Sequence, residues 1–339
     1  MNGLSASARK LPALGDIRFW LLVAALVGII AALLALRIEL TRSARDILLV
    51  IDITGSMNVR DYAAGGQPET RLDAAKRAMR ALTAALPCQS KVGLAIFTER
   101  RAFLLFEPSE VCANFSAIDG AIDTLNWRMA WEGDSHVARG IDSALDMADS
   151  LKADLVFLTD GQEAPPLPAT GAPGFAMEPG KVHGLLVGIG GVEPAPIPKF
   201  DDDGREIGFY DEADVPQENR SGPPPEDAPS RAGWDPRNAP WGGDVASGTE
   251  HLSAVREDHL RTIAAQTGLA YARLEAVPGF VTDVMAATSP RPVRTSVDTA
   301  SIPAALALLA LLVVYGALPL AAWRGRTPRQ LPITRGYRR

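Results

Sequence analysis

The sequence predicts an α/β fold with a doubly wound, mostly parallel sheet. Continuous apolar runs rich in strand-forming residues alternate with segments whose apolar residues recur at helical spacing. The runs 46–53 (DILLVIDI) and 153–159 (ADLVFLT) carry apolar residues without alternation, as strands do when both faces of a sheet are covered. These runs are therefore expected to be central strands.

The elements between residues 45 and 285 follow in order along the chain. Thr70-x-x-Asp73 has the form of a capping box, and it precedes an amphipathic helix that Pro87 ends. The later elements are expected at 91–98 (strand), 102–106 (strand), 115–125 (helix), 137–148 (helix), 153–159 (strand), 182–189 (strand), 260–264 (helix, ended by Gly268) and 269–274 (strand).

One long segment, 190–248, interrupts this pattern. It is rich in Pro, Gly, Asp and Glu, and such a long connection inside a compact domain is usually functional or disordered. Its acidic triplet, Asp201–Asp203, lacks the ligand spacing of an EF-hand calcium loop. We expect a solvated loop.

Composition limits the function classes. The chain has 339 residues, a hydrophobic content of 47% and a formal net charge of −6, from 34 Lys+Arg and 40 Asp+Glu. This composition excludes a wholly disordered chain. Because no basic, aromatic-rich patch occurs, nucleic acid is not expected as a partner.

Apolar runs near both ends have the length of a bilayer-spanning helix. They lie at 19–36 and 302–323, and neither contains a charge. The alternative for the first run is a cleaved signal peptide, because Arg9, Lys10 and Arg18 form a basic region before it. No small-x-small cleavage site follows Leu36, so we favour an uncleaved anchor.

The charges beside the second run predict the orientation. Six arginines without an acid follow it, at 324, 326, 329, 335, 338 and 339. We therefore expect a cytoplasmic N-terminus at 1–18, a basic cytoplasmic tail at 324–339, and the body at 45–285 on the periplasmic side of a bacterial inner membrane.

Cys88 and Cys112 are the only cysteines. In an oxidising periplasm they are candidates for a disulfide, which would join the end of one helix to a segment after the next hairpin. The alternative is two buried, inert thiols.

The residues that carry chemistry follow the first buried strand. Asp52, Thr54 and Ser56 place a carboxylate and two hydroxyls at alternate positions, where ligands bind in open α/β sheets. Asp160 follows another buried strand, and Ser135, with Asp134 beside it, precedes a helix. Such hard oxygen donors suit Mg²⁺ or Ca²⁺.

This pattern resembles the metal-ion-dependent adhesion site of von Willebrand factor A domains. The resemblance covers about residues 45–285 apart from the long segment, and it implies the doubly wound fold of that family. It implies that Thr54 and Ser56 bind the metal directly, and that Ser135 adds a third hydroxyl. Asp52 and Asp160 would act mainly through water. The implied cofactor is Mg²⁺, or Ca²⁺ or Mn²⁺, and an acidic side chain of a protein partner would complete the coordination. Asp134 is an additional candidate ligand.

An enzymatic alternative comes from the same aspartate. A haloacid-dehalogenase-like phosphohydrolase has an acid at the end of its first strand, but a second acid two residues later, where this chain has Thr54. The four histidines form no His-x-x-x-His pair. We therefore expect a binding protein and no enzyme.

The arrangement of two anchors around this domain resembles two bacterial groups that accompany MoxR-type ATPases. These are the Bat aerotolerance proteins and, more closely, the Mxa accessory proteins of methylotrophs, the L-type in particular. The closer resemblance rests on 52–62 (DITGSMNVRDY), 97–108 (FTERRAFLLFEP), 126–134 (NWRMAWEGD) and 215–225 (VPQENRSGPPP). It implies a role in the maturation of periplasmic methanol dehydrogenase, including calcium insertion, together with other Mxa proteins and a MoxR-type ATPase. A Bat-like envelope function is the alternative.

Overall fold

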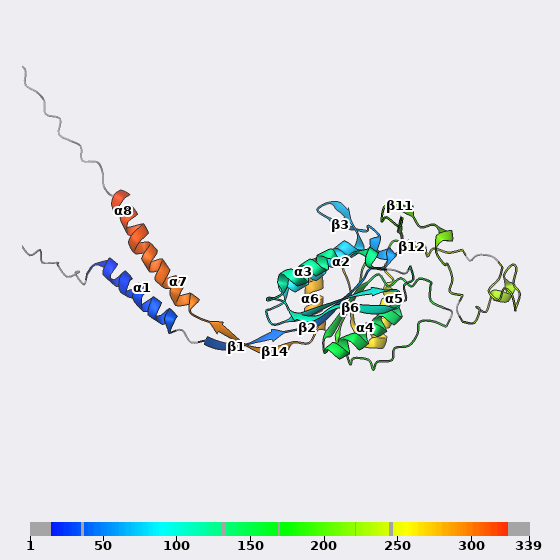
Figure 1. The fold of residues 1–339 in the computed structure, drawn as a ribbon, viewed down its shortest axis with the longest axis horizontal. Coiled ribbons are helices and arrows are strands. Elements are labelled where there is room, and N and C mark those ends of the chain that lie inside the picture. The colour runs from blue at the N-terminus through cyan, green and yellow to red at the C-terminus, as the bar shows by residue number, and fades with distance from the viewer. Residues whose placement is uncertain are drawn as a thin grey trace, which may run out of the picture. The chain divides into compact units, whose positions relative to one another are not determined.

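The computed structural model describes residues 15–34, 37–130, 133–168, 170–220, 222–243 and 247–324. The chain divides into two compact units, of which the larger, Ser43–Val293, is here called the body (Figure 1). The smaller unit combines segments from the two ends of the chain. Most of the expected N-terminal segment, 1–18, and nearly all of the basic tail, 324–339, lie outside the described residues.

The body is built on a six-stranded sheet in the order β13-β8-β7-β2-β5-β6. Neighbouring strands run parallel except for β6, which is antiparallel to β5. The strands are β2 (Asp46–Asp52), β5 (Lys91–Thr98), β6 (Arg101–Glu110), β7 (Asp154–Thr159), β8 (Gly184–Gly188) and β13 (Ala270–Arg273). The predicted doubly wound sheet is confirmed. Strand β6 is longer than predicted because it pairs along the whole of β5, from Thr98 to Lys91.

Helices cover both faces of this sheet (Figure 1). One buried cluster joins the sheet to α2 (Arg71–Ala85), α3 (Phe115–Thr124) and α6 (Val277–Ala287). A second cluster joins the opposite face to α4 (Val137–Leu151) and α5 (Glu257–Thr267). Because strands β2, β5 and β7 contribute side chains to both clusters, their sequences are apolar without interruption.

Local signals at the helix ends act as the sequence predicts. The Thr70 hydroxyl accepts a 3.0 Å hydrogen bond from the Asp73 backbone N–H at the start of α2. Gly268 ends α5 in the left-handed conformation, with φ of 78°.

A short hairpin follows the first strand, where only a polar loop was expected. Strands β3 (Tyr62–Ala64) and β4 (Gln67–Glu69) pair antiparallel. Gly65 and Gly66 form the turn with φ of 57° and 81°. A two-residue turn of this kind needs positive φ at both positions, which glycine adopts without steric cost.

The long segment 190–248 is more structured than a solvated loop. It contains β9 (Ala195–Pro196), β10 (Pro198–Phe200) and β11 (Glu206–Phe209), and β9 pairs with β12 (Leu252–Ser253). Phe200 stacks on Trp127 with ring centroids 4.5 Å apart, so the segment is packed against the rest of the body. We call residues 190–248 the insert.

The smaller unit contains the two apolar helical segments. These are α1 (Ile17–Leu33) and the continuous run of α7 (Ser301–Leu312), a π-helical turn (Val313–Ala317) and α8 (Leu318–Arg324). Gly28 on α1 lies against α7, where an added Cβ would be 3.1 Å from the Cβ of Ala307. Small residues at such contacts let helix backbones approach closely.

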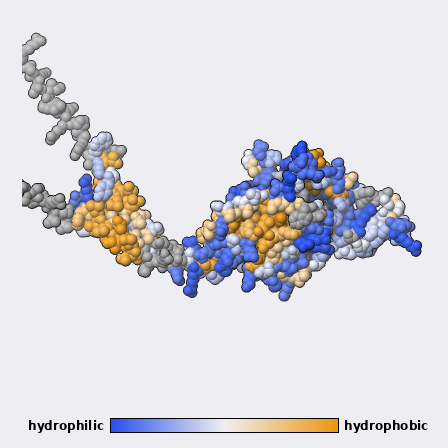
Figure 2. All heavy atoms as spheres, viewed as in Figure 1, coloured by the Kyte–Doolittle hydropathy of each residue, from blue (hydrophilic) through white to orange (hydrophobic). Residues whose placement is uncertain are grey.

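The outer surfaces of these helices are mostly hydrophobic (Figure 2). Among the described residues, one helix, Ser301–Ala321, is long and apolar enough to cross a membrane. Helix α1 has 17 residues and is shorter than the span predicted at 19–36. Strands β1 (Arg37–Ala44) and β14 (Arg291–Asp298), which the sequence did not predict, pair in a separate two-stranded sheet.

Candidate metal centre

The first motif lies at the carboxyl edge of the central strand β2. Asp52 is the last residue of that strand, and its side chain is fully buried. Its Oδ1 accepts hydrogen bonds from the Thr54 backbone N–H at 2.9 Å and from the Thr54 hydroxyl at 2.7 Å. Because the hydroxyl hydrogen points to Asp52, the lone pairs of Thr54 Oγ1 are left for a cation.

A threonine from the neighbouring strand completes the environment of Asp52. The Thr159 hydroxyl on β7 donates a 2.6 Å hydrogen bond to Asp52 Oδ2. Burial and the nearby Asp160 carboxylate raise the pKa of Asp52 to about 7, although the hydrogen bonds from Thr159 and Thr54 oppose this shift. Two buried acids at one edge would be stabilised by a cation between or beside them.

The structure brings Ser135 to the same edge from a distant part of the chain. Its backbone exchanges two 2.7 Å hydrogen bonds with Ala164, which follows β7, and the next N–H, of His136, donates to Glu99 O after β5. The Ser135 side chain is buried, and its Oγ has no hydrogen-bond partner among the described residues. A buried hydroxyl without a partner at this place fits a metal ligand.

Asp160 has a partner that the sequence analysis missed. Its Oδ2 accepts hydrogen bonds from Arg71 at 2.8 Å and from the Ser253 hydroxyl at 3.1 Å, and its Oδ1 accepts one from the Gln162 N–H at 3.0 Å. Both Arg71 and Asp160 are fully buried. Asp160 therefore fits the indirect role that the motif implies better than that of a direct ligand.

Arg71 also binds Asp61, which it reaches through Nε at 2.9 Å and Nη2 at 2.7 Å. One sequence signal points to a structural role for Arg71, namely its position at the start of a helix. A cation in the first turn of α2 opposes the helix dipole, so such a residue needs another reason to be there.

The donor set fits a hard divalent cation. Thr54, Ser56 and Ser135 supply hydroxyl oxygens, and Asp52 and Asp160 supply buried negative charge. Asp134, the additional candidate, is exposed, and its carboxylate lies 3.8 Å from the His136 ring nitrogen. No sulfur or imidazole is part of this set, so soft metals are not favoured.

The comparisons with known proteins concern the body. Residues 47–162 match the family model of the von Willebrand factor type A domain. The body has the von Willebrand factor A fold, with its mostly parallel sheet flanked by helices. Domains of this type often hold a metal ion through an adhesion site and generally serve protein–protein interaction.

Several solved structures are similar to this chain at low identity. An aerotolerance-related membrane protein from Bacteroides fragilis is 15% identical, with 72% of this chain and 98% of that chain covered and a TM-score of 0.44. A membrane-spanning protein from Vibrio fischeri is 17% identical over 72% of this chain and 96% of that one, with a TM-score of 0.28. A von Willebrand factor type A protein from Catenulispora acidiphila is 14% identical over 80% and 47%, with a TM-score of 0.32. No curated protein matches the sequence.

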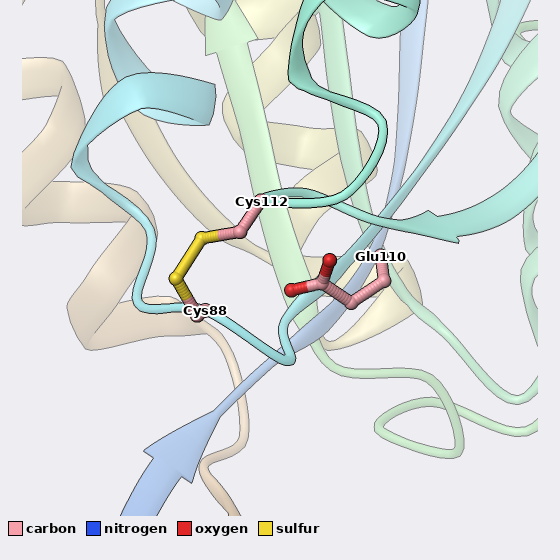
Figure 3. A group of neighbouring side chains, drawn as sticks. All are labelled: Cys88, Glu110 and Cys112. Carbon is pink, nitrogen blue, oxygen red and sulfur yellow. A yellow bond between two sulfur atoms is a disulfide. The ribbon is translucent and has the colours of Figure 1, made fainter. Parts of the chain in front are cut away.

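Cys88, Glu110 and Cys112 form a second group of side chains that lie close enough together to hold a metal ion (Figure 3). Cys88 and Cys112 are joined in a disulfide, with Cα atoms 5.2 Å apart, so their sulfurs are not free to bind a metal. The carboxylate of Glu110 accepts backbone hydrogen bonds from Ala113 at 2.6 Å and Gln89 at 2.5 Å, which lower its pKa. The group therefore joins the segment before β5 to the segment after β6.

Proposed function

We propose that this protein is a membrane-anchored, metal-dependent protein-binding module. The observation that carries the proposal is the meeting of three hydroxyl-bearing residues and two buried acids at one edge of the sheet, with the Ser135 Oγ unpartnered. In this arrangement the protein supplies mostly neutral direct ligands, so much of the charge of a divalent cation is not neutralised. A coordination position therefore remains for a carboxylate from a partner.

Membrane attachment is part of the proposal. The helix Ser301–Ala321 supplies one span, and α1 is proposed as the second, with small residues at its contact with α7. The arginines after the second span would keep both ends in the cytoplasm and the body in the periplasm. The Cys88–Cys112 disulfide supports an oxidising compartment for the body.

Metal binding is tested by calorimetric titration of Mg²⁺, Ca²⁺ and Mn²⁺ into the full chain in detergent micelles. Asp52→Asn should abolish binding because it removes the buried charge. Thr54→Val should weaken it strongly, whereas Thr54→Ser keeps the hydroxyl and should retain it. Asp258→Ala is a matched control, because Asp258 is exposed on α5. Equal affinity in Asp52→Asn and the unsubstituted protein would show that the metal site is elsewhere.

For the client, we propose periplasmic methanol dehydrogenase, on the resemblance to Mxa accessory proteins. Other Mxa-type proteins and a MoxR-type ATPase would then act with this chain. Deleting the gene should leave the dehydrogenase exported but inactive and poor in calcium, and a gene carrying Asp52→Asn should not restore it. A fully metallated dehydrogenase in the deletion strain would contradict this role and favour a Bat-like envelope function.

A phosphohydrolase activity is not part of the proposal. Both oxygens of Asp52 accept hydrogen bonds from threonines, and Thr54 stands where such an enzyme has its second acid. Metal-dependent hydrolysis of a phosphate ester that disappears in Asp52→Asn would contradict this conclusion.

A further inference from the structure

A cavity of about 450 Å³ lies over the candidate metal centre. Thr54, Ser56 and Ser135 line it on the side of the sheet, and the insert contributes Ile197, Tyr210 and Val215. Cavities of this size, with an apolar lining and a few polar groups, are typical of sites that enclose a small ligand or a short chain segment. The candidate metal is therefore reached through a pocket and is not on an open face.

The insert is fastened where it forms this pocket. Trp127, which also lines the cavity, stacks on Phe200 of the insert with ring centroids 4.5 Å apart. Arg60 forms an ion pair with Glu206 of the insert at 2.5 Å. These two contacts hold the insert in place as a wall of the pocket. Part of the entropy cost of ordering the insert is therefore met on folding and does not weaken ligand binding.

Two buried polar atoms in the lining have no partner among the described residues. One is Ser135 Oγ, which is assigned to the metal, and the other is Gln162 Oε1. The Gln162 side chain is 3% exposed, and its amide nitrogen donates to the carbonyls of Glu250 at 3.0 Å and Leu252 at 3.4 Å. Those two carbonyls fix the amide orientation, so Oε1 remains an acceptor that requires an N–H or O–H donor.

The charges around the cavity make the binding of an acidic ligand depend on the metal. Asp134, Asp214 and Glu250 also line it. Lys199 pairs with Asp214 at 2.7 Å and Arg256 with Glu250 at 3.3 Å. Within the described residues, Asp134 has no Lys or Arg partner, and its carboxylate lies 3.8 Å from the His136 ring. Without a cation, a carboxylate entering this pocket would meet net negative charge, so an acidic ligand should bind only with the metal.

We propose that the insert turns this edge of the sheet into a pocket that encloses one extended peptide segment of the partner protein. The partner carboxylate that the proposed function assigns to the metal belongs to this segment. A backbone N–H of the segment donates to Gln162 Oε1, and an apolar side chain next to the carboxylate packs against Trp127, Ile197 and Tyr210. The volume admits a few residues and excludes a broad folded surface. This inference rests on the proposed metal-dependent binding function and specifies its ligand.

The test uses two blocked hexapeptide libraries, one with a fixed glutamate and one with glutamine at the same position. The immobilised full chain in detergent micelles should enrich the glutamate library with Mg²⁺ and not with EDTA, and enriched peptides should carry apolar residues next to the glutamate. Gln162→Leu should lower the affinity for an enriched peptide about 3- to 10-fold, as expected for one lost hydrogen bond. Tyr210→Ala, on the insert outside the sheet, should lower it to a similar extent.

Gln266→Leu is the matched control, because Gln266 is exposed on α5 and should leave peptide affinity unchanged. Mg²⁺ titration of each variant without peptide separates loss of the metal from loss of a peptide contact. Failure of the unsubstituted protein to bind Mg²⁺ would overturn the proposed function and this inference together. Mg²⁺ binding without enrichment, equal enrichment of both libraries, or unchanged affinity in Gln162→Leu and Tyr210→Ala would overturn the inference alone.

Discussion

The buried Arg71 should be a major source of stability for the body. Its guanidinium is fully buried and donates five hydrogen bonds, two to Asp61, one to Asp160 and two to Ser253. Arg71→Met keeps much of the apolar volume but leaves the buried Asp160 without its cation. Breaking a buried pair from one side typically costs about 3–5 kcal/mol, a large share of the roughly 5–15 kcal/mol that stabilises a domain.

The assay is urea unfolding of the full chain in detergent micelles with EDTA, followed by tryptophan fluorescence. Arg77→Met is the matched control on the same helix, because the Arg77 side chain is 45% exposed and pairs with Glu69 at the surface. We expect it to change stability by less than about 1 kcal/mol. Arg71→Met combined with Asp160→Asn should recover part of the loss, because the second substitution removes the unpaired charge. Equal midpoints for Arg71→Met and Arg77→Met, or no recovery in the double variant, would refute the reasoning.

Three further predictions concern the disulfide, a helix contact and pH. Cys88→Ser should lower the free energy of unfolding by about 3 kcal/mol, because the disulfide closes a loop with a sequence separation of 24. Reductant added to the unsubstituted protein should cause a matching loss of stability. Unchanged stability in both experiments would contradict the prediction. Gly140→Ala on α4 should lower the free energy of unfolding by about 1–3 kcal/mol, because the new Cβ would lie 2.1 Å from Phe97 Cε2. Gly120→Ala on α3, where an added Cβ meets nothing within 4 Å, should be neutral or stabilising by up to about 1 kcal/mol. The reverse order of the two variants in thermal unfolding would be inconsistent with the packing. The pKa of Asp52 is raised from 3.8 to about 7 in the folded, metal-free protein, so its contribution to stability is fully present below pH 3.8 and is lost as pH rises through about 7. Urea midpoints in EDTA should therefore fall between about pH 4 and about pH 7, and Asp52→Asn should reduce this fall. An equal fall in both proteins would argue against the shift.

Much of the fold could be predicted from the sequence because its signals are local. The runs that became β2 and β7 are apolar without interruption, and Thr70 and Gly268 mark helix ends through backbone hydrogen bonding that depends only on near neighbours. Helix α6 was missed because Pro278 and Gly279 in its first turn weaken the helical pattern.

The sequence by itself determined one part of the candidate metal centre. Asp52, Thr54 and Ser56 are close in the chain, so a strand end followed by a turn is enough to gather their oxygens. Only the tertiary structure decided the rest. The strand order brings Asp160 beside Asp52, and the backbone bonds between Ser135 and Ala164 bring in the third hydroxyl.

The same distinction applies to Arg71 and to the insert. In the sequence, Arg71 is a cation in the first turn of a helix, which is an exposed position in most proteins. Its burial depends on Asp61, Asp160 and Ser253, which are 10, 89 and 182 residues away in the chain. The insert has the composition of a solvated loop, and it becomes a pocket wall through the contact of Phe200 with Trp127. Composition and periodicity describe what a segment does with its near neighbours, whereas these roles arise from contacts between residues that only the folded chain brings together.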